Sequence, residues 1–327
     1  MLANACADPT ILKSSGFVSE RGDQSGEKVS GIRTGGEASM TENRLQGKIC
    51  LVTGSTSGIG KVTARELANR GATVVLVSRS RAKGEATQAE IKQATGNQEV
   101  ELLVADLSVL ENVRHLAAEF QHTHDHLHLL VNNAGAAYPR RTLTSEGLEA
   151  TLAVNYLAPF LLTELLLDTL KASAPARIVN VSSAQHATVS MEFDNLQGEK
   201  TYATLRNYGQ AKLALLLWTY ELARRLEGTG VTVNALHPGI TASNFPAGMA
   251  GPAAWAMKLS KPFLLTAEQG AQTTLYLATS PQVEGVTGKY FAKSQAKPSS
   301  SRSYDKTVGL RLWEVTEQLV ARVAQRT

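Results

Sequence analysis

Tyr208 and Lys212 lie four residues apart in the stretch Tyr-Gly-Gln-Ala-Lys and could together exchange a proton with a substrate. In a helix, this spacing places both side chains on one face. A phenol has an ordinary pKa of about 10, which is too high for easy proton exchange at neutral pH. A nearby ammonium stabilises the phenolate and lowers that pKa. The pair could then serve a substrate oxygen as general acid and base. The same spacing is also common on surface helices, so the position of the pair in the fold must decide between a catalytic pair and an ordinary surface pair.

A glycine-rich stretch far upstream could bind the phosphates of a nucleotide. Residues 53–60 read Thr-Gly-Ser-Thr-Ser-Gly-Ile-Gly, between a short apolar run and a helical pattern. Glycines let the backbone turn tightly and approach a ligand closely. The following helix would direct its free N–H groups and the positive end of its dipole toward a phosphate. A plain surface loop uses the same residue types, so the stretch alone leaves both interpretations open.

The rest of the chain must position these two motifs. From Lys48 onward, short β-branched runs alternate with longer amphipathic segments. This alternation predicts an α/β fold: a single doubly wound (Rossmann) domain with a seven-stranded parallel sheet and helices on both faces. The predicted strands are Ile49–Thr53, Thr73–Ser78, Glu99–Ala105, Leu127–Asn132, Ala176–Ser182, Val231–Leu236 and Lys289–Ala292. The predicted helices are Ile59–Arg70, Ala82–Ala94, Val109–His122, Ser145–Lys171, Tyr208–Gly228 and Ala267–Ser280, with a last helix in 303–325 whose apolar face is Leu310, Trp313, Leu319 and Val323.

Composition divides the chain and excludes several classes of protein. We expect residues 1–44, rich in Gly, Ser and charge, to be a disordered extension, 45–300 to form the domain, and 301–327 to be a C-terminal helix and tail. A net charge of +4 over 327 residues does not indicate nucleic-acid binding. Two cysteines form no disulfide framework, which fits a reducing compartment. No apolar stretch is long enough for an integral membrane segment, and a cytoplasmic protein is expected.

Ligands of such sheets bind beyond the carboxyl ends of the strands. The second predicted strand ends in Ser78-Arg79, where a site for the unphosphorylated dinucleotide would carry an acidic residue. An arginine instead suits a 2′-phosphate by its charge and forked geometry. A solvated helix start is the alternative.

Two further strand ends carry polar or small residues. Asp106, followed by Leu107, could accept a hydrogen bond from an adenine amino group or could cap the next helix. The fourth strand ends in Asn132-Asn133-Ala134-Gly135, where small residues let a ligand lie against the strand and asparagine can join neighbouring strands. Upstream, four histidines alternate within residues 122–128, a pattern that could suggest a metal site. We favour a solvated loop, because a helix end and loop give no convergent ligand geometry.

Taken together, these motifs resemble the short-chain dehydrogenases/reductases over residues from about 46 to 291. The shared elements are Thr53-Gly54-xxx-Gly58-Ile59-Gly60, Asp106, Asn132-Asn133-Ala134-Gly135, Asn155, Ser183, Tyr208-xxx-Lys212 and Pro238-Gly239. More narrowly, residues 177–183, 195–200, 221–226 and 237–239 resemble the retinol dehydrogenase branch, which includes the microsomal retinal reductases. That branch prefers NADP(H), in agreement with Ser78-Arg79.

The resemblance implies catalytic roles for four residues. Tyr208 would be the general acid and base, and Lys212 would lower its pKa and hold the nicotinamide ribose. Ser183 would hydrogen-bond the substrate oxygen. Asn155 would kink its helix and steady a water relay toward Lys212.

The resemblance also implies an NADP(H) site. Gly54, Ser57, Gly58, Ile59 and Gly60 would hold the pyrophosphate, Asp106 and Leu107 would flank the adenine, Asn133 and Gly135 would line the cofactor, Ile240 would meet the nicotinamide amide through its backbone, and Ser243 would take the place of the family's threonine.

The expected function is therefore an NADP(H)-dependent oxidoreductase that interconverts an alcohol and an aldehyde or ketone on a small hydrophobic substrate of retinoid, steroid or lipid-aldehyde type. The apolar stretch Thr241–Leu265 would cover the active site as a lid. Ala184, Gln185 and His186 would line the pocket, with a second proton carrier as the alternative role for His186. A non-catalytic dinucleotide-binding sensor or scaffold is the alternative function.

Two expectations concern association. Relatives in the retinol branch often carry an apolar N-terminal anchor, whereas this chain has a polar extension, so we expect a soluble enzyme. The two long predicted helices, Ser145–Lys171 and Tyr208–Gly228, could form a homodimer interface.

Overall fold

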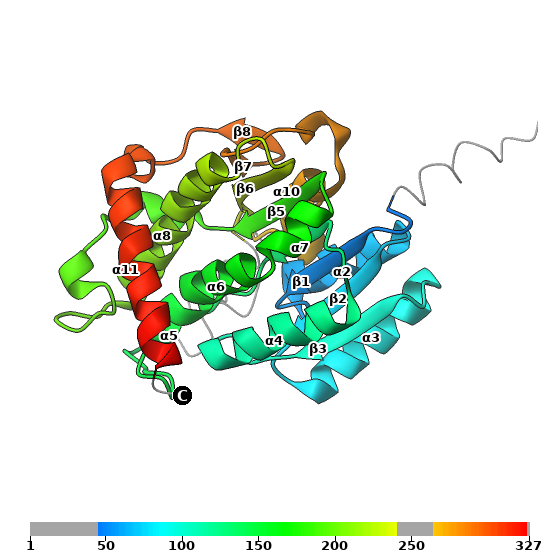
Figure 1. The fold of residues 1–327 in the computed structure, drawn as a ribbon, viewed down its shortest axis with the longest axis horizontal. Coiled ribbons are helices and arrows are strands. Elements are labelled where there is room, and N and C mark those ends of the chain that lie inside the picture. Colours follow the sequence, from blue (N-terminus) through cyan, green and yellow to red (C-terminus); the bar gives the residue numbers. More distant parts are fainter. Residues whose placement is uncertain (1–44, 241–263, 326–327) are drawn as a thin grey trace, which may run out of the picture.

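A mostly parallel sheet lies at the centre of the computed structural model, which describes residues 45–240 and 264–325 (Figure 1). The strand order is β3-β2-β1-β4-β5-β6-β7-β8. The predicted extension 1–44 and most of the predicted lid lie outside the described residues. The strands are β1 (Ile49–Thr53), β2 (Thr73–Ser78), β3 (Val100–Val104), β4 (Leu129–Asn132), β5 (Ala176–Val181), β6 (Val231–His237), β7 (Tyr290–Ala292) and β8 (Gln295–Lys297).

Strands β1 to β7 are parallel, so the predicted seven-stranded doubly wound sheet is confirmed. The sheet has one more strand than predicted, because β8 pairs antiparallel with β7. Lys293 and Ser294 form the tight turn between them, with φ angles of 52° and 56°. All three residues of β8 are exposed. A strand this short and without a buried face leaves no alternation of apolar and polar residues in the sequence.

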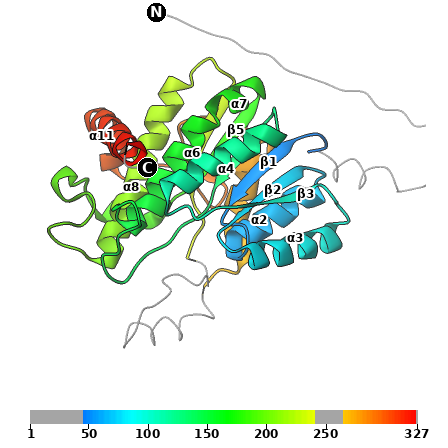
Figure 2. The same cartoon turned by 60° about the horizontal axis from the view of Figure 1, so that its bottom comes forward.

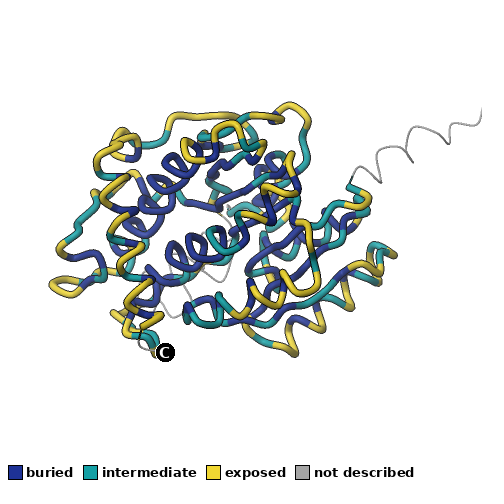
Figure 3. Tube along the Cα trace, in the orientation of Figure 1, coloured by how far each residue is buried: buried dark blue, intermediate teal, exposed yellow. Residues whose placement is uncertain are grey.

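Helices cover both faces of the sheet (Figure 2), and the strands are largely buried (Figure 3). Two clusters of apolar side chains fill the space between the sheet and the helices. One cluster joins the strands to α4, α6, α8 and α11. The other joins them to α2, α3 and α10. The helices are α2 (Gly58–Asn69), α3 (Arg81–Thr95), α4 (Leu110–Thr123), α5 (Ala150–Leu152), α6 (Ala158–Leu165), α7 (Leu167–Ala172), α8 (Thr204–Arg225), α10 (Ala267–Thr279) and α11 (Lys306–Ala324).

The single helix predicted over 145–171 is wrong, because this stretch is broken into several pieces. Helix α5 begins only after Glu149, whose carboxylate accepts hydrogen bonds from the backbone N–H groups of Thr151 and Leu152. A π-helical turn, Ala153–Leu157, then separates α5 from α6. Such turns inside helices are frequent at functional sites.

Helix α11 covers the outer surface of α6 and α8, alongside α8 in Figure 1. The Trp313 ring lies 5.2 Å from that of Phe160 on α6, and the Tyr156 and Thr316 hydroxyls are 2.7 Å apart. The predicted apolar face of this helix is partly wrong, because Leu310 is 47% exposed while Leu312 is buried. The face of α6 and α8 considered for a homodimer therefore packs, at least in part, against a helix of the same chain.

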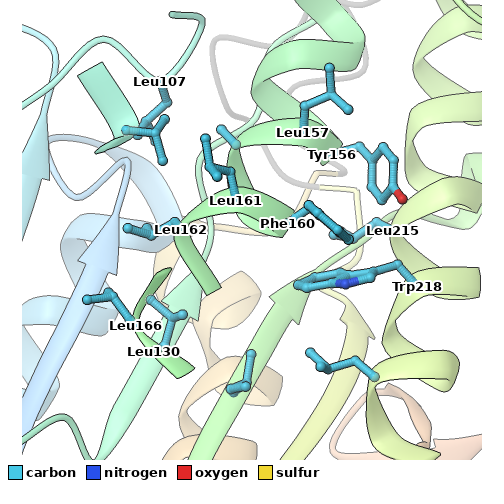
Figure 4. Packing of buried hydrophobic residues seen from close by; sticks show 14 of the residues in the cluster. Leu107, Leu130, Tyr156, Leu157, Phe160, Leu161, Leu162, Leu166, Leu215 and Trp218 are labelled. Atoms are coloured by element: carbon cyan, nitrogen blue, oxygen red, sulfur yellow. The ribbon is translucent and has the colours of Figure 1, made fainter. Parts of the chain in front are cut away.

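The cluster beneath α11 generates a prediction about stability. Phe160 is buried between Tyr156, Trp218 and Trp313 (Figure 4). We expect Phe160→Ala to lower the free energy of unfolding by about 3–5 kcal/mol, because it leaves a cavity in a packed core. Urea denaturation followed by circular dichroism measures the change. Leu205→Ala, at a position that is 52% exposed, is the control and should change stability by less than about 0.5 kcal/mol. Equal effects in the two variants would contradict the described packing.

Candidate active site

The carboxyl ends of β1 and β4 are joined by a cluster of short hydrogen bonds. The Asn133 Nδ2 donates to the backbone oxygens of Thr53 (2.8 Å) and Gly54 (3.2 Å). The Thr53 hydroxyl accepts from the backbone N–H groups of Asn133 and Ala134, each at 3.0 Å. Asn133 thus holds the glycine-rich turn against the neighbouring strand, and the predicted asparagine link between strands is confirmed.

The geometry of the turn requires its glycines. Gly54 and Gly58 have φ angles of 65° and 53°, which side chains other than glycine rarely adopt. A Cβ on Gly60 would lie only 2.3 Å from the Gly54 carbonyl oxygen. Helix α2 begins directly after Ser57, and among the described residues the Ser57 side chain makes no capping hydrogen bond to its first N–H groups. Its first N–H groups are therefore available for an anion such as a pyrophosphate.

At the end of β2, the guanidinium of Arg79 is accessible to a ligand, whereas the hydroxyl of Ser78 is buried and engaged in a hydrogen bond. Ser78 is buried, and its hydroxyl donates to the Ser80 carbonyl at 2.9 Å. Arg79 is exposed, and no ion pair is found for it within residues 45–240 and 264–325. The backbone N–H of Ser55 bonds the Val77 carbonyl at 3.4 Å, so the end of β2 adjoins the glycine turn. Arg79 is thus a free cation beside the predicted phosphate site.

Asp106 does not cap the following helix, so that interpretation is wrong. Its Oδ1 accepts from the N–H and hydroxyl of Ser108, at 3.0 and 2.8 Å. The Glu146 carboxylate bonds the first N–H groups of α4 instead, at 2.7 and 2.9 Å. Leu107 packs its side chain into the cluster beneath α4. The predicted adenine contacts of both residues stay predictions.

The predicted proton-exchange pair lies in the second and third turns of α8, which begins at Thr204, four residues before its predicted start. Tyr208 hydrogen-bonds the side chain of Ser183, which lies two residues after the end of β5. Lys212 is buried, and its Nζ donates to the Val181 carbonyl at 2.8 Å. The same Nζ lies 5.7 Å from the centre of the Tyr208 ring. The structure therefore brings Ser183, Tyr208 and Lys212 together at the carboxyl end of β5.

The electrostatics of this cluster differ from the prediction. Burial raises the pKa of Tyr208 to about 12, with the hydrogen bond to Ser183 acting in the opposite direction. Burial also lowers the pKa of Lys212 to about 7. In this structure, Lys212 thus does not lower the pKa of Tyr208 as predicted. Desolvation disfavours the charged form of each group, and it is the largest cause of both shifts.

Asn155 lies in the π-helical turn and faces the same cluster. Its Nδ2 donates to the carbonyls of Ala136 (2.6 Å) and Thr151 (2.8 Å). Its Oδ1 is buried and has no hydrogen-bond partner among the described residues. A Cβ on Gly135 would lie 2.9 Å from this oxygen and 3.6 Å from the Lys212 Nζ. Glycine at 135 therefore keeps open a small space between an unpartnered acceptor and a buried amine.

Two of the remaining predicted cofactor contacts lie at the edge of the described structure. Ile240 is 72% exposed, and its carbonyl accepts from the N–H of Leu265 at 2.9 Å. Its carbonyl is thus already engaged. Ser243 and the lid residues up to 263 lie outside the described residues.

His186 has a different environment from the one predicted. It is 3% exposed, and both ring nitrogens have hydrogen-bond partners, the Ser183 carbonyl and the Ser300 N–H. Because both ring nitrogens are engaged, this arrangement does not support the role of second proton carrier, and the role of pocket wall stays a prediction. Sequence reasoning missed this contact because Ser300 is far away in the chain.

The alternating histidines each have separate surroundings. The ring of His124 stacks on Phe120, and His128 accepts from the N–H of Ile49 at 3.1 Å. His126 lies 3.3 Å from the Ser173 hydroxyl. Among the described residues, no group of three or more potential ligands could hold a metal ion.

The residues at this edge of the sheet fit a dinucleotide on structural grounds. Helix α2 presents free N–H groups, Gly60 and Gly135 leave room that a Cβ would fill, and Asn155 holds an unpartnered buried oxygen. These features follow β1 and β4 in the chain, and the strand order of the sheet reverses direction between these two strands.

Comparisons with known proteins agree with this geometry. A family model described as short chain dehydrogenase matches residues 48–250. Retinol dehydrogenase 12 from Mus musculus is 42% identical over 285 residues, which is 87% of this chain and 90% of the relative. Retinol dehydrogenase 11 from Homo sapiens is 43% identical over 277 residues, 85% of this chain and 87% of the relative.

Solved structures show the same fold. An uncharacterised protein from Mycobacterium paratuberculosis has a TM-score of 0.69 and 32% identity, over 84% of this chain and 94% of its own. Pseudomonas aeruginosa RhlG, in an active-site complex with NADP, has a TM-score of 0.62 and 26% identity, over 80% and 99%. Within the described residues, no helix has the length and apolar character needed to cross a membrane. This chain therefore belongs to the short-chain dehydrogenase family and, within it, to the retinol dehydrogenase branch of oxidoreductases.

Proposed function

We propose that this protein is an NADP(H)-dependent oxidoreductase that interconverts an alcohol and an aldehyde or ketone on a hydrophobic substrate. The observation that carries the proposal is the contact between Ser183 and Tyr208 above the buried amine of Lys212. The two hydroxyls can both reach one substrate oxygen, which is the geometry that general acid catalysis needs.

The chain's own residues would handle the proton and the orientation of the substrate. A bound nicotinamide would supply the hydride chemistry. Tyr208 would hold the proton at its Oη and pass it to the substrate oxygen, while Ser183 donates a second hydrogen bond to that oxygen. Lys212 and the Asn155 Oδ1 would hold the ribose and a water beside Gly135.

In the free protein, burial raises the pKa of Tyr208 to about 12, so the phenol holds the proton that it would donate to a carbonyl oxygen.

Two observations support the choice of cofactor and substrate. Arg79 is exposed at the end of β2, where the preference for NADP(H) would be set, and it has no ion-pair partner among the residues that the structure describes. The names of the relatives suggest a retinoid or a similarly hydrophobic carbonyl compound as substrate.

Replacing the proposed acid tests the mechanism. We expect Tyr208→Phe to lower kcat for carbonyl reduction by about 10²- to 10⁴-fold, because it removes the transferable proton. NADPH binding, measured by fluorescence titration, should stay within twofold of the wild type. Tyr276→Phe, which removes from α10 a phenol hydroxyl that donates to the Gln282 Oε1, is the matched control. A Tyr208→Phe variant with wild-type turnover would refute the assignment.

Reversing the charge at the end of β2 tests the cofactor preference. We expect Arg79→Asp to shift the ratio of kcat/KM for NADPH over NADH by about 10- to 100-fold toward NADH. A hydrogen bond to a charged group contributes about 1.5–3 kcal/mol, and losing it would change the ratio by about this factor. Steady-state kinetics with both cofactors measure the ratio. Lys92→Asp, in the last turn of α3, changes the net charge equally and should leave the ratio unchanged. An unaltered ratio in Arg79→Asp would exclude a phosphate contact.

The buried amine predicts a pH dependence of stability. The pKa of Lys212 is about 7 in the fold and 10.5 ordinarily, so between these values only the unfolded chain binds the proton. Stability should therefore rise with pH from 7 to 10, by at most about 1.4 kcal/mol per pH unit from this group. Lys212→Met should show a flatter rise in urea denaturation at pH 7 and pH 9.5. Parallel curves for the two proteins would show that the amine is not desolvated.

A further inference from the structure

The imidazole of His186 connects the serine of the active site to the C-terminal part of the chain. Its Nδ1 lies 2.6 Å from the Ser183 carbonyl oxygen, and its Nε2 lies 3.1 Å from the backbone nitrogen of Ser300. The amide of Ser300 can only donate, so Nε2 is the acceptor. The ring proton must then lie on Nδ1, which donates it to the Ser183 carbonyl. Both polar atoms of this buried ring are therefore used, and the ring has one orientation.

A second imidazole holds the next residue. The N–H of Ala184 donates to the Nδ1 of His237, at the end of β6, at 3.3 Å. The backbone on both sides of the Ser183–Ala184 bond is thus fixed by histidines from two elements. The Ser183 side chain itself accepts from the N–H of Gln185 at 3.3 Å, which leaves it pointing toward Tyr208.

The segment 299–304, which holds His186, is anchored on α8. The hydroxyl of Ser299 lies 2.6 Å from those of both Tyr220 and Ser303, and the Ser299 N–H donates to the Tyr304 hydroxyl at 3.0 Å. The rings of Tyr220 and Tyr304 stack with their centres 5.1 Å apart. Tyr220 lies on the same helix as Tyr208, roughly three turns further on. One helix therefore carries the proposed acid and also anchors the segment that orients the serine.

We propose that His186 is a positioning residue, which fixes Ser183 against Tyr208 and ties that geometry to segment 299–304. The proposal rests on the function proposed above. Neither ring nitrogen is free for the substrate, so His186 acts through Ser183 and not on the substrate itself. Misplacement of a reacting group by about 1 Å can cost about 10²-fold in rate. Segment 299–304 lies outside the residues 48–250 that match the family model, so the site depends on a part of the chain beyond that match.

Three substitutions of His186 test the proposal. His186→Leu removes both hydrogen bonds, and we expect kcat for carbonyl reduction to fall by about tenfold or more. The KM for NADPH should change less than twofold. In His186→Asn the amide nitrogen can still reach the Ser183 carbonyl, and most of the lost kcat should return. In His186→Gln the amide lies nearer the position of Nε2, so this variant should lose as much kcat as His186→Leu. Equal kcat in Asn and Gln variants, or wild-type kcat in Leu, would overturn the proposal.

Hydrogen exchange gives a readout that does not require turnover. We expect His186→Leu to speed amide exchange in peptides covering both 183–186 and 298–304, measured by mass spectrometry on the full-length protein. Ser300→Ala keeps the backbone donor and removes only a side-chain hydroxyl, so it should change neither exchange nor kcat. If the wild type reduces no carbonyl compound, the proposed function fails while the exchange result still decides the coupling. Unchanged exchange in His186→Leu would overturn the coupling.

Discussion

The burial of a primary amine is the constraint on which the site depends. Lys212 lies inside the molecule, and its Nζ hydrogen-bonds the Val181 carbonyl at the end of β5. Burying an ammonium is costly unless it is paired, so the surroundings must either hold the neutral amine or supply acceptors. Burial lowers the pKa of Lys212 in this structure, which favours the neutral amine. The unpartnered oxygen of Asn155 nearby is a further acceptor, and a ligand or water placed between the two would relieve both groups.

The fold delivers this amine through the register of a parallel sheet. Strands β1, β4 and β5 end together, and buried amide groups fix their relative positions. The Asn132 Nδ2 bonds the Asn180 Oδ1 at 2.9 Å, and the Asn180 Nδ2 bonds the Thr219 hydroxyl of α8 at the same distance. These bonds connect two strands to the helix that carries Tyr208 and Lys212. Buried amides of this kind tolerate no shift in register, because any shift would leave them unsatisfied.

Much of this arrangement was predictable from sequence, and the failures have physical reasons. The parallel strands and the glycine turn could be found because burial on both sheet faces and positive φ angles leave strong local patterns. Three other features could not be found in this way: the π-helical turn at Ala153–Leu157, the Glu146 cap of α4, and the contact between His186 and Ser300. Each of these is set by a partner distant in sequence or by a competition within one helix, and neither leaves a periodic signal. Leu310 was misassigned because it lies only two positions from the buried Leu312, which puts two leucines on nearly opposite sides of the helix.

The same distinction explains why burial raises the pKa of Tyr208 in the free protein, although Lys212 lies on the same helix face. The spacing of Tyr208 and Lys212 specifies a shared face, but it does not specify how much water that face retains. Both groups are desolvated, and each charged form is penalised before the pair can stabilise it. Charge brought into the site by a cofactor would act on both groups at once. The catalytic pKa of Tyr208 is therefore a property of the loaded site, and the chain supplies the neutral, oriented donor from which it starts.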